Sequence, residues 1–235
     1  MLEKLQDRVH AGKLLADEIA RKYNNDNNDV IILALPRGGV PVAYQISQRI
    51  KAPLDVFLVR KIGVEGHEEL AMGAITETST IYNEDIIAML HINEESIERV
   101  IKRESAELQR RNEKYRKGKP APDVTGKTTI LFGRSFFAFN SFIYHFCYIS
   151  NPKKIVIAAP VAAPDTLKKM SKEVDDTICP LTPRNLGGIG AWYKDFTQTE
   201  DNEVIEILER TNRDFPVPTI SAEETAKLQN EAIVE

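Results

Sequence analysis

The chain has 235 residues, of which 42% are hydrophobic and 28% charged, and its formal net charge is −4. This length can bury a sizeable core, so we expect one main globular domain. The balance of acidic and basic residues gives no basic footprint, which argues against nucleic acid or an anionic membrane as partners. Cys147 and Cys179 form neither a disulfide framework nor a zinc motif, and the N-terminus has no apolar signal segment. We therefore expect a cytoplasmic protein with a small-molecule or protein partner.

Short apolar runs rich in β-branched residues alternate with segments of helical spacing along the chain. Residues 4–22, 40–50 and a segment from about 165 are expected helices. Buried strands alternating with helices predict an α/β fold with a mainly parallel sheet flanked by helices. The expected buried strands are residues 30–35, 54–60, 128–132 and 153–160.

The middle of the chain has a different pattern. Residues 71–76 and 79–83 resemble the two strands of a β-hairpin, and residues 93–117 predict a long charged helix that begins after Asn93. We expect a hairpin/helix subdomain at about 76–118, inserted into a domain that spans residues 1–210. Residues 211–235 are expected to form a C-terminal tail.

The segment Pro36-Arg37-Gly38-Gly39 follows the first buried strand and opens a helix. In α/β sheets ligands bind outside the carboxyl ends of the strands, and paired glycines let a backbone approach an anion closely. Arg37 can donate a forked pair of hydrogen bonds to phosphate oxygens. The alternative is a tight turn that only needs glycine. The motifs of dinucleotide-binding enzymes and P-loop NTPases do not fit this chain.

A second basic feature, Arg60-Lys61, ends the expected strand at 54–60 and enters a segment with two glycines. Such cations could meet a phosphorylated substrate and close over it, or they could be a solvated strand end. The neighbouring residues His67, Glu68 and Glu69 could bind a metal or move protons, but a surface loop is the simpler interpretation.

Five blocks of the sequence together resemble the conserved predicted phosphoribosyltransferases of type I fold, over about residues 4–210. The resemblance implies that Pro36–Gly39 hold the pyrophosphate of phosphoribosyl pyrophosphate (PRPP), and that Arg60 and Lys61 are catalytic residues that begin a flexible closing loop. It also implies Mg²⁺ as cofactor, transfer of phosphoribose to a nitrogen acceptor with release of pyrophosphate, and a role in nucleotide metabolism. The blocks are LPRGGVPVA, VRKIG, GHEELAMGAI, NPKKIVIAAPVAAP and GAWYKDFTQT.

Trp192 and Tyr193 lie in the last of these blocks. They could stack on the acceptor base, or they could belong to an aromatic cluster that closes the core. The sequence assigns no metal ligand, and a homo-oligomer is compatible with it.

Residues 132–150, which we call the aromatic window, depart from the family. Members carry there an acidic pair and a Gly/Thr-rich turn, broadly D-D-G-x-A-T-G-x-T, that bind the ribose and the 5-phosphate. The window instead contains six of the nine phenylalanines, and Arg134 is its only permanent charge. Three interpretations are open: a shifted reading frame, a relative that has lost catalysis, or an altered site with base-stacking aromatic residues. A membrane-spanning helix is disfavoured because Arg134 and several polar residues interrupt the window.

We therefore expect a phosphoribosyltransferase-like protein whose own activity is impaired. The alternative is a non-catalytic module of the same fold that binds a phosphorylated metabolite or regulates a partner. A phosphoester hydrolase that uses His67 and Glu68 is a third hypothesis.

Overall fold

The computed structural model describes residues 4–24, 29–77, 79–133 and 151–221. The chain divides into two compact units, each built from two segments. The first unit comprises Met1–Phe57 and Asp123–Pro218, and the second comprises Leu58–Pro122 and Thr219–Glu235. Each unit is described by itself.

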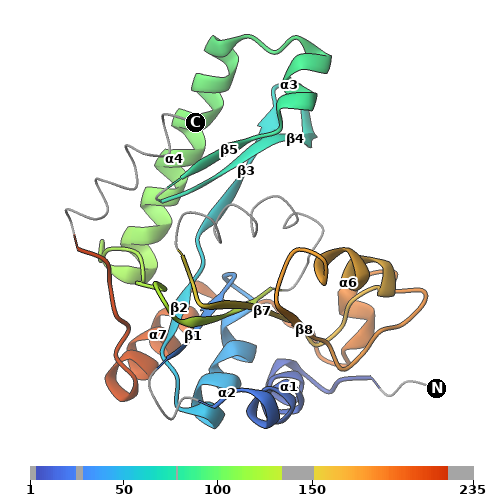
Figure 1. The fold of residues 1–235 in the computed structure, drawn as a ribbon, viewed down its shortest axis with the longest axis vertical. Helices are drawn as coiled ribbons and strands as arrows, with labels where there is room; N and C mark the ends of the chain where they lie inside the picture. Colours follow the sequence, from blue (N-terminus) through green and yellow to red (C-terminus); the bar gives the residue numbers. More distant parts are fainter. Residues whose placement is uncertain (1–3, 25–28, 78, 134–150, 222–235) are drawn as a thin grey trace. The chain divides into compact units, whose positions relative to one another are not determined.

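The first unit is built on a five-stranded sheet in the order β2-β1-β6-β7-β8, and every neighbouring pair of strands is parallel (Figure 1). The central strands β1 and β6 are buried along their whole length, as expected for a sheet covered on both faces. This confirms the predicted fold class. The strands are β1 (Val30–Ala34), β2 (Leu54–Val56), β6 (Thr128–Phe132), β7 (Lys154–Ala158) and β8 (Asp176–Ile178).

Helices α1, α2 and α7 are drawn below this sheet in Figure 1, and α2 packs against both of the others. Asp7 caps α1 by accepting a hydrogen bond from the N–H of His10, and Pro41 in the first turn of α2 occupies a position that needs no N–H partner. The helical elements of this unit are α1 (Arg8–Lys22), α2 (Val40–Ile50), α6 (Pro164–Met170), the 3₁₀ helix η1 (Ile189–Trp192) and α7 (Asp201–Asp214).

The second unit is an antiparallel sheet, in the order β3-β4-β5, with α4 packed on β3 and β4. The predicted hairpin is confirmed, because β4 pairs with β5, and the predicted long helix begins after Asn93, whose side chain accepts from the N–H of Ser96. The elements are β3 (Val59–Val64), β4 (His67–Thr76), β5 (Thr80–Tyr82), α3 (Glu84–Leu90) and α4 (Glu94–Arg116).

The structure corrects the prediction of one strand at 54–60. The parallel strand β2 ends at Val56, the N–H of Phe57 still donates to Ala34 O at 2.8 Å, and β3 begins at Val59 in the other sheet. An unbroken apolar run marks burial but not the point where a chain changes sheets. Four further elements, α3, β8, η1 and α7, were not predicted from the sequence.

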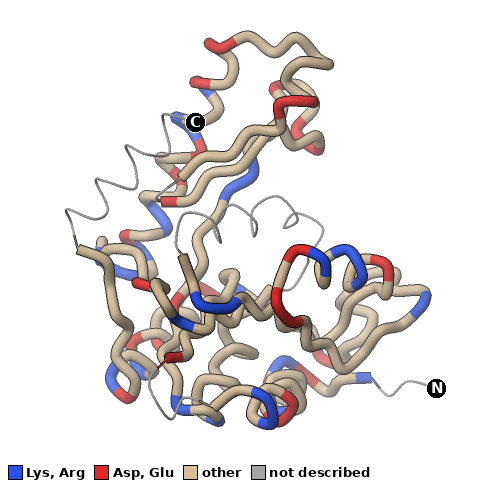
Figure 2. Tube along the Cα trace, in the orientation of Figure 1, with Lys and Arg blue, Asp and Glu red and all other residues tan. Residues whose placement is uncertain are grey.

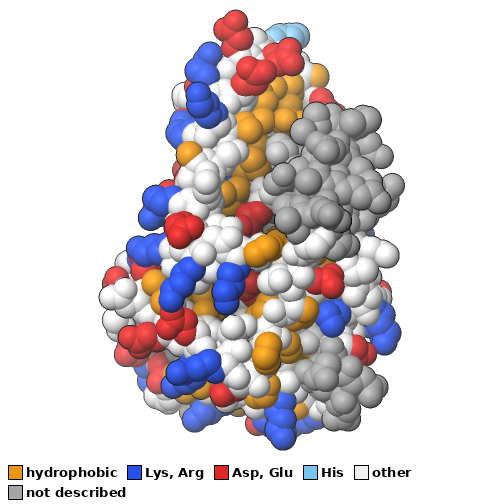
Figure 3. Space-filling view, turned by 90° about the vertical axis from the view of Figure 1, so that its left-hand side faces the viewer, with side chains coloured by type: hydrophobic (Ala, Val, Ile, Leu, Met, Phe, Trp, Pro, Cys, Tyr) orange, Lys and Arg blue, Asp and Glu red, His pale blue; other side chains and the backbone are white. Residues whose placement is uncertain are grey.

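Charged residues of both signs are interspersed along α4 and over the face drawn in the space-filling view (Figures 2 and 3). Within the described ranges no helix is long and apolar enough to cross a membrane. The surface that can be seen therefore agrees with the small net charge of the whole chain.

Replacing Asn93 by Ala should lower the free energy of unfolding by about 1 kcal/mol, because the N–H of Ser96 loses its capping acceptor. Urea denaturation followed by circular dichroism measures the change. Asn93→Ser keeps a capping oxygen and serves as the control. If Asn93→Ser lost as much stability as Asn93→Ala, the capping hydrogen bond would not be the cause of the loss.

Candidate functional site

A short loop, Leu35–Gly39, leaves the sheet of the first unit at the carboxyl end of β1 and leads into α2. The N–H of Leu35 donates to Phe132 O at the end of β6 (2.9 Å), so parallel pairing continues into the start of the loop. The N–H of Gly39 donates to Leu35 O (3.1 Å), and that of Val40 donates to Arg37 O (3.1 Å). The turn is closed by its own backbone at the place where α/β folds bind ligands.

Gly39 occupies a position that has no room for a side chain. A Cβ there would lie 2.5 Å from Leu35 O and 3.2 Å from Cδ1 of Phe132. Its φ of −74° is open to any residue, so close packing and not conformation requires glycine. The alternative interpretation of this loop, a tight turn that needs glycine, therefore accounts for Gly39.

The middle of the loop contains hydrogen-bond donors. Pro36 and Arg37 are joined by a cis peptide bond. Among the described residues no hydrogen bond engages the backbone N–H of Arg37 or of Gly38. The Arg37 side chain is about one-third exposed, at 37%, and its Nη1 lies 3.9 Å from Oδ2 of Asp201 in the first turn of α7. Two N–H groups and a guanidinium at a helix N-terminus form an arrangement that binds anions.

A narrow apolar crevice lies beside the loop, at the carboxyl ends of β6 and β7. Phe132 and the segment after β7 contribute apolar side chains to its lining, and Arg8 contributes a positively charged one. Its lining residues are Arg8, Gly38, Val42, Phe132, Pro160, Val161, Ile189, Tyr193 and Phe196.

Trp192 and Tyr193, the two residues predicted to stack on a base, have different surroundings in this region. Tyr193 lines the crevice, packs against Phe196 (4.9 Å between ring centroids) and is buried, which raises its pKa to about 12. Trp192 packs on the cluster of Leu5, Ala11, Val161 and Tyr193, and its Nε1 donates to Leu186 O at 2.8 Å. Of the two, only Tyr193 lines the crevice.

Arg8 also lines the crevice. Its guanidinium lies over the ring of Phe196, 4.3 Å from the centroid, and its Nη1 donates to Thr197 O. A cation stacked on an aromatic ring stabilises both side chains. Phe196 lies in the predicted stacking segment with Trp192 and Tyr193, whereas Arg8 was not predicted as a site residue, because it comes from a distant part of the chain and gives no local signal.

Arg60 and Lys61 belong to the second unit. The structure places them inside strand β3, paired with Ile75 and Ala74, and not at the end of a strand where a loop begins, as predicted. Strand β3 runs on to Val64, and the tight turn follows at Gly66, where φ is +79°. The alternation of a strand turns neighbouring side chains to opposite faces, so the two cations do not act as one pair.

Arg60 has a short ion pair with a buried carboxylate, and Lys61 has a long one with an exposed carboxylate. Arg60 Nη2 lies 2.6 Å and its Nε 2.8 Å from Oε2 of Glu104, a buried carboxylate of α4. Lys61 Nζ lies 3.9 Å from Oε2 of Glu69, whose side chain is fully exposed. Glu104 was not among the predicted site residues, although its position between Val100 and Leu108 on the buried face of α4 was a visible signal.

The candidate metal-binding or proton-transfer residues of the second unit are surface groups. His67, Glu68 and Glu69 begin strand β4 on its exposed part, and Glu68 lies 3.7 Å from Arg103 Nη2. No group of three or more His, Cys, Asp or Glu side chains that could hold a metal occurs in the described part of the chain. The described residues thus offer no Mg²⁺ site made of protein ligands alone.

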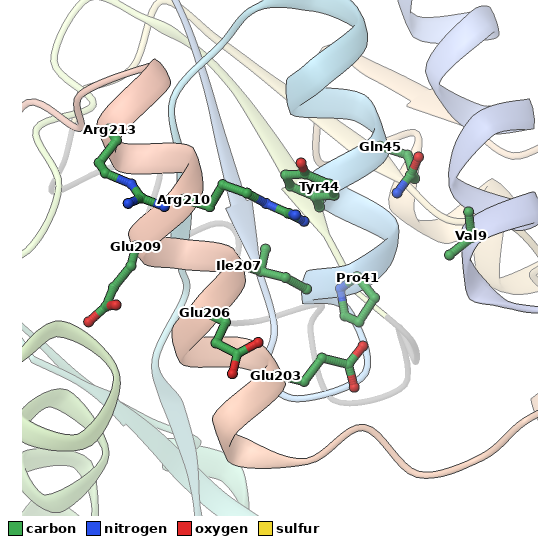
Figure 4. Close-up of a pocket in the computed structure, with 10 residues that line it drawn as sticks. All are labelled: Val9, Pro41, Tyr44, Gln45, Glu203, Glu206, Ile207, Glu209, Arg210 and Arg213. Carbon is green, nitrogen blue, oxygen red and sulfur yellow. The ribbon is translucent and has the colours of Figure 1, made fainter.

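A second hollow of the first unit, about 480 Å³ in volume, lies over α2 between α7 and Val9 of α1 (Figure 4). Arg210 reaches across it to the ring of Tyr44, with 4.5 Å between its guanidinium carbon and the centroid. Glu203 and Glu206 lie near Pro41 at its lower end in the same view. It is a polar groove of mixed charge, and the carboxyl ends of the strands do not line it.

The family model named phosphoribosyl transferase domain matches residues 5–131, which is more than half of the chain. The chain therefore belongs to the phosphoribosyl transferase domain family. The match ends one residue before the aromatic window, of which residues 134–150 lie outside the described residues.

Two curated relatives from Mycobacterium tuberculosis, of strains CDC 1551 and H37Rv, are named "Putative phosphoribosyl transferase" MT0597 and Rv0571c. Each is 34% identical to this chain over 218 residues, which is 91% of the chain and 48% of the relative. The chain thus spans about half the length of these relatives. The crystal structure of TT1426 from Thermus thermophilus is similar, with a TM-score of 0.75 and 29% identity over 88% of this chain and 98% of that one.

Replacing Gly39 by Ala should destabilise the first unit by roughly 1–3 kcal/mol, because the added methyl group collides with Leu35 O. Thermal or urea unfolding measures the loss. Gly188→Ala is the matched control, since its φ is −105° and no atom lies within 4 Å of its Cβ position. Equal stability of the two variants would contradict the close packing described for the loop.

Proposed function

We propose that this protein is a phosphoribosyltransferase-like protein that binds PRPP through the loop Pro36–Gly39. The observation that carries the proposal is the loop at the carboxyl end of β1, where the backbone N–H groups of Arg37 and Gly38 remain available among the described residues. A pyrophosphate group suits such a set of donors at a helix N-terminus.

In this proposal the parent reaction is the transfer of phosphoribose from PRPP to a nucleobase or a related nitrogen acceptor, with release of pyrophosphate. Pro36–Gly39 bind the leaving group and neutralise its charge, and Arg60 and Lys61 remain the predicted catalytic cations. Mg²⁺, by family resemblance, would enter bound to the pyrophosphate oxygens of the substrate and withdraw electron density from them when present. The crevice beside Tyr193 has a volume of only about 10 Å³, and Tyr193 belongs to a buried core cluster, so this region supports the alternative of an aromatic cluster that closes the core.

The chain's own transferase activity should be weak, because its sequence has no carboxylate between Phe132 and Asp165. The family's acidic pair, which would bind the ribose hydroxyl groups, is expected within that segment. This same absence from the sequence favours the second candidate function, a non-catalytic module that binds PRPP or a similar phosphometabolite.

Arg37→Ala should weaken the binding of Mg²⁺–PRPP or of Mg²⁺–pyrophosphate at least about tenfold, since a charged hydrogen-bond partner contributes on the order of 1.5–3 kcal/mol. Isothermal titration calorimetry at fixed salt measures the change. Arg49→Ala is the control, because Arg49 lies in the last turn of the same helix and pairs with Asp17 at 3.2 Å. Binding that is equal in the two variants would locate the phosphate site elsewhere.

With PRPP, Mg²⁺ and a panel of nucleobases, the protein should release pyrophosphate far more slowly than an ordinary transferase, whose turnover is about 1–10³ per second. A coupled pyrophosphate assay provides the measurement. Turnover in the ordinary range would contradict impairment. Sequencing the coding DNA across codons 126–154 then separates the causes: an acidic pair in another frame indicates a frame error, and uninterrupted coding in this frame favours the non-catalytic module.

A further inference from the structure

The hollow over α2 in Figure 4, which we call the α7 groove, has no role in the proposed function. It belongs wholly to the first unit, because α1, α2 and α7 supply all the side chains that line it. Its volume is about 480 Å³, and the apolar residues Val9, Pro41 and Ile207 lie among its charged ones. Val9 is 42% exposed. A partner that covers the groove would therefore bury apolar surface and pair charges at the same time.

Four charged residues of α7 form one stripe along the helix. Glu203 and Glu206 lie in the N-terminal half of α7, and Arg210 and Arg213 lie in its C-terminal half. All four are exposed, and Figure 4 shows them in this order from the lower to the upper end of the helix. Their spacing keeps them within an arc of about 80°, and Glu209 lies outside it. One face of the helix therefore has an acidic half and a basic half.

The charges of this stripe have little ionic support within the chain. Among the described residues, no ion pair or hydrogen bond engages the side chains of Glu203, Glu206 and Arg213. Arg210 stacks on the ring of Tyr44, with 4.5 Å between its guanidinium carbon and the centroid. Stacking uses the face of a guanidinium and leaves the N–H donors along its edges for a carboxylate. The ring thus holds Arg210 in a position from which it can accept a charged partner.

A second copy of this chain supplies the complementary charges. In an interface with two-fold symmetry, residue i contacts residue j of the partner, and j contacts i. Antiparallel packing of two α7 helices, centred at the level of Leu208, places Glu206 of one copy opposite Arg210 of the other. The same centre places Glu203 opposite Arg213, because Leu208 lies midway between these residues too. Parallel packing in register would instead place like charges opposite each other, which is unfavourable.

We propose that the α7 groove is the contact surface between two copies of this chain, which associate through antiparallel α7 helices around a two-fold axis. In this dimer α7 of each copy lies along the groove of the other, against Val9 and Pro41. Exposed ion pairs contribute little each, so the dimer is weak and salt dissociates it. The charges fix the orientation and the register of the two helices. The inference needs no phosphorylated ligand, so it stands or falls separately from the proposed function.

Sedimentation equilibrium of the full chain tests the proposal. The wild type should form dimers at low salt and dissociate at about 1 M salt, where the Debye length falls to about 3 Å. Glu206→Arg and Arg210→Glu should each weaken dimerisation at least about tenfold, because two-fold symmetry puts every substitution into the interface twice. Glu98→Arg is the matched control, since it makes the same charge change at an exposed position of α4, and it should dimerise as the wild type does.

The double variant Glu206→Arg/Arg210→Glu exchanges the two charges and provides the second measurement. It should regain dimerisation to within a few-fold of the wild type, although it loses the stack on Tyr44. Single variants that dimerise as the wild type does, or a double variant no better than the single ones, would overturn the inference. A wild type that stays monomeric at low salt would also overturn it, and would leave the groove to a small ligand or to a different protein.

Discussion

The parallel pairing of β1 with β6 is the constraint on which the candidate site depends. The register runs from Val30 opposite Thr128 to Ala34 opposite Phe132, and the next N–H, that of Leu35, still donates to Phe132 O. In a parallel sheet all carboxyl ends meet at one edge, so the loop after β1 opens there. The absence of a Cβ at Gly39, which would lie 2.5 Å from Leu35 O and 3.2 Å from Cδ1 of Phe132, allows α2 to begin close to that edge.

The two predicted groups of cationic residues are stabilised by different physics. The side chain of Arg37 follows a backbone turn, and its ion pair with Asp201 is long, at 3.9 Å from Nη1 to Oδ2. Arg60 is held by two short hydrogen bonds to a buried carboxylate. A loosely held cation can exchange its partner for a ligand, whereas a tightly held one contributes a fixed direction.

Much of the fold followed from sequence periodicity. Unbroken apolar runs identified the central strands, and the capping residue Asn93 identified the start of α4. The boundary between β2 and β3 could not be predicted, because Phe57 and Leu58 are buried whichever sheet they join. Helix α7 was missed because its charged sequence resembles a solvated loop, although buried Val204, Ile207, Leu208 and Thr211 recur at helical spacing.

The candidate site was predicted in part. The loop Pro36–Gly39 carries a local signal, two glycines after a buried strand, and the structure places it at the strand ends. The partners Glu104 and Asp201 and the crevice residue Arg8 come from distant segments, so only folding brings them to their contacts. The catalytic roles of Arg60 and Lys61 stay predictions, and their expected flexible loop is a hairpin strand.

A crystal structure of the protein grown with Mg²⁺ and inorganic pyrophosphate tests the central claim most directly. The account predicts pyrophosphate oxygens within hydrogen-bond distance of the backbone N–H groups of Arg37 and Gly38, with the Arg37 side chain turned from Asp201 toward the ligand. Pyrophosphate bound at saturating concentration to another surface, with this loop left empty, would contradict it.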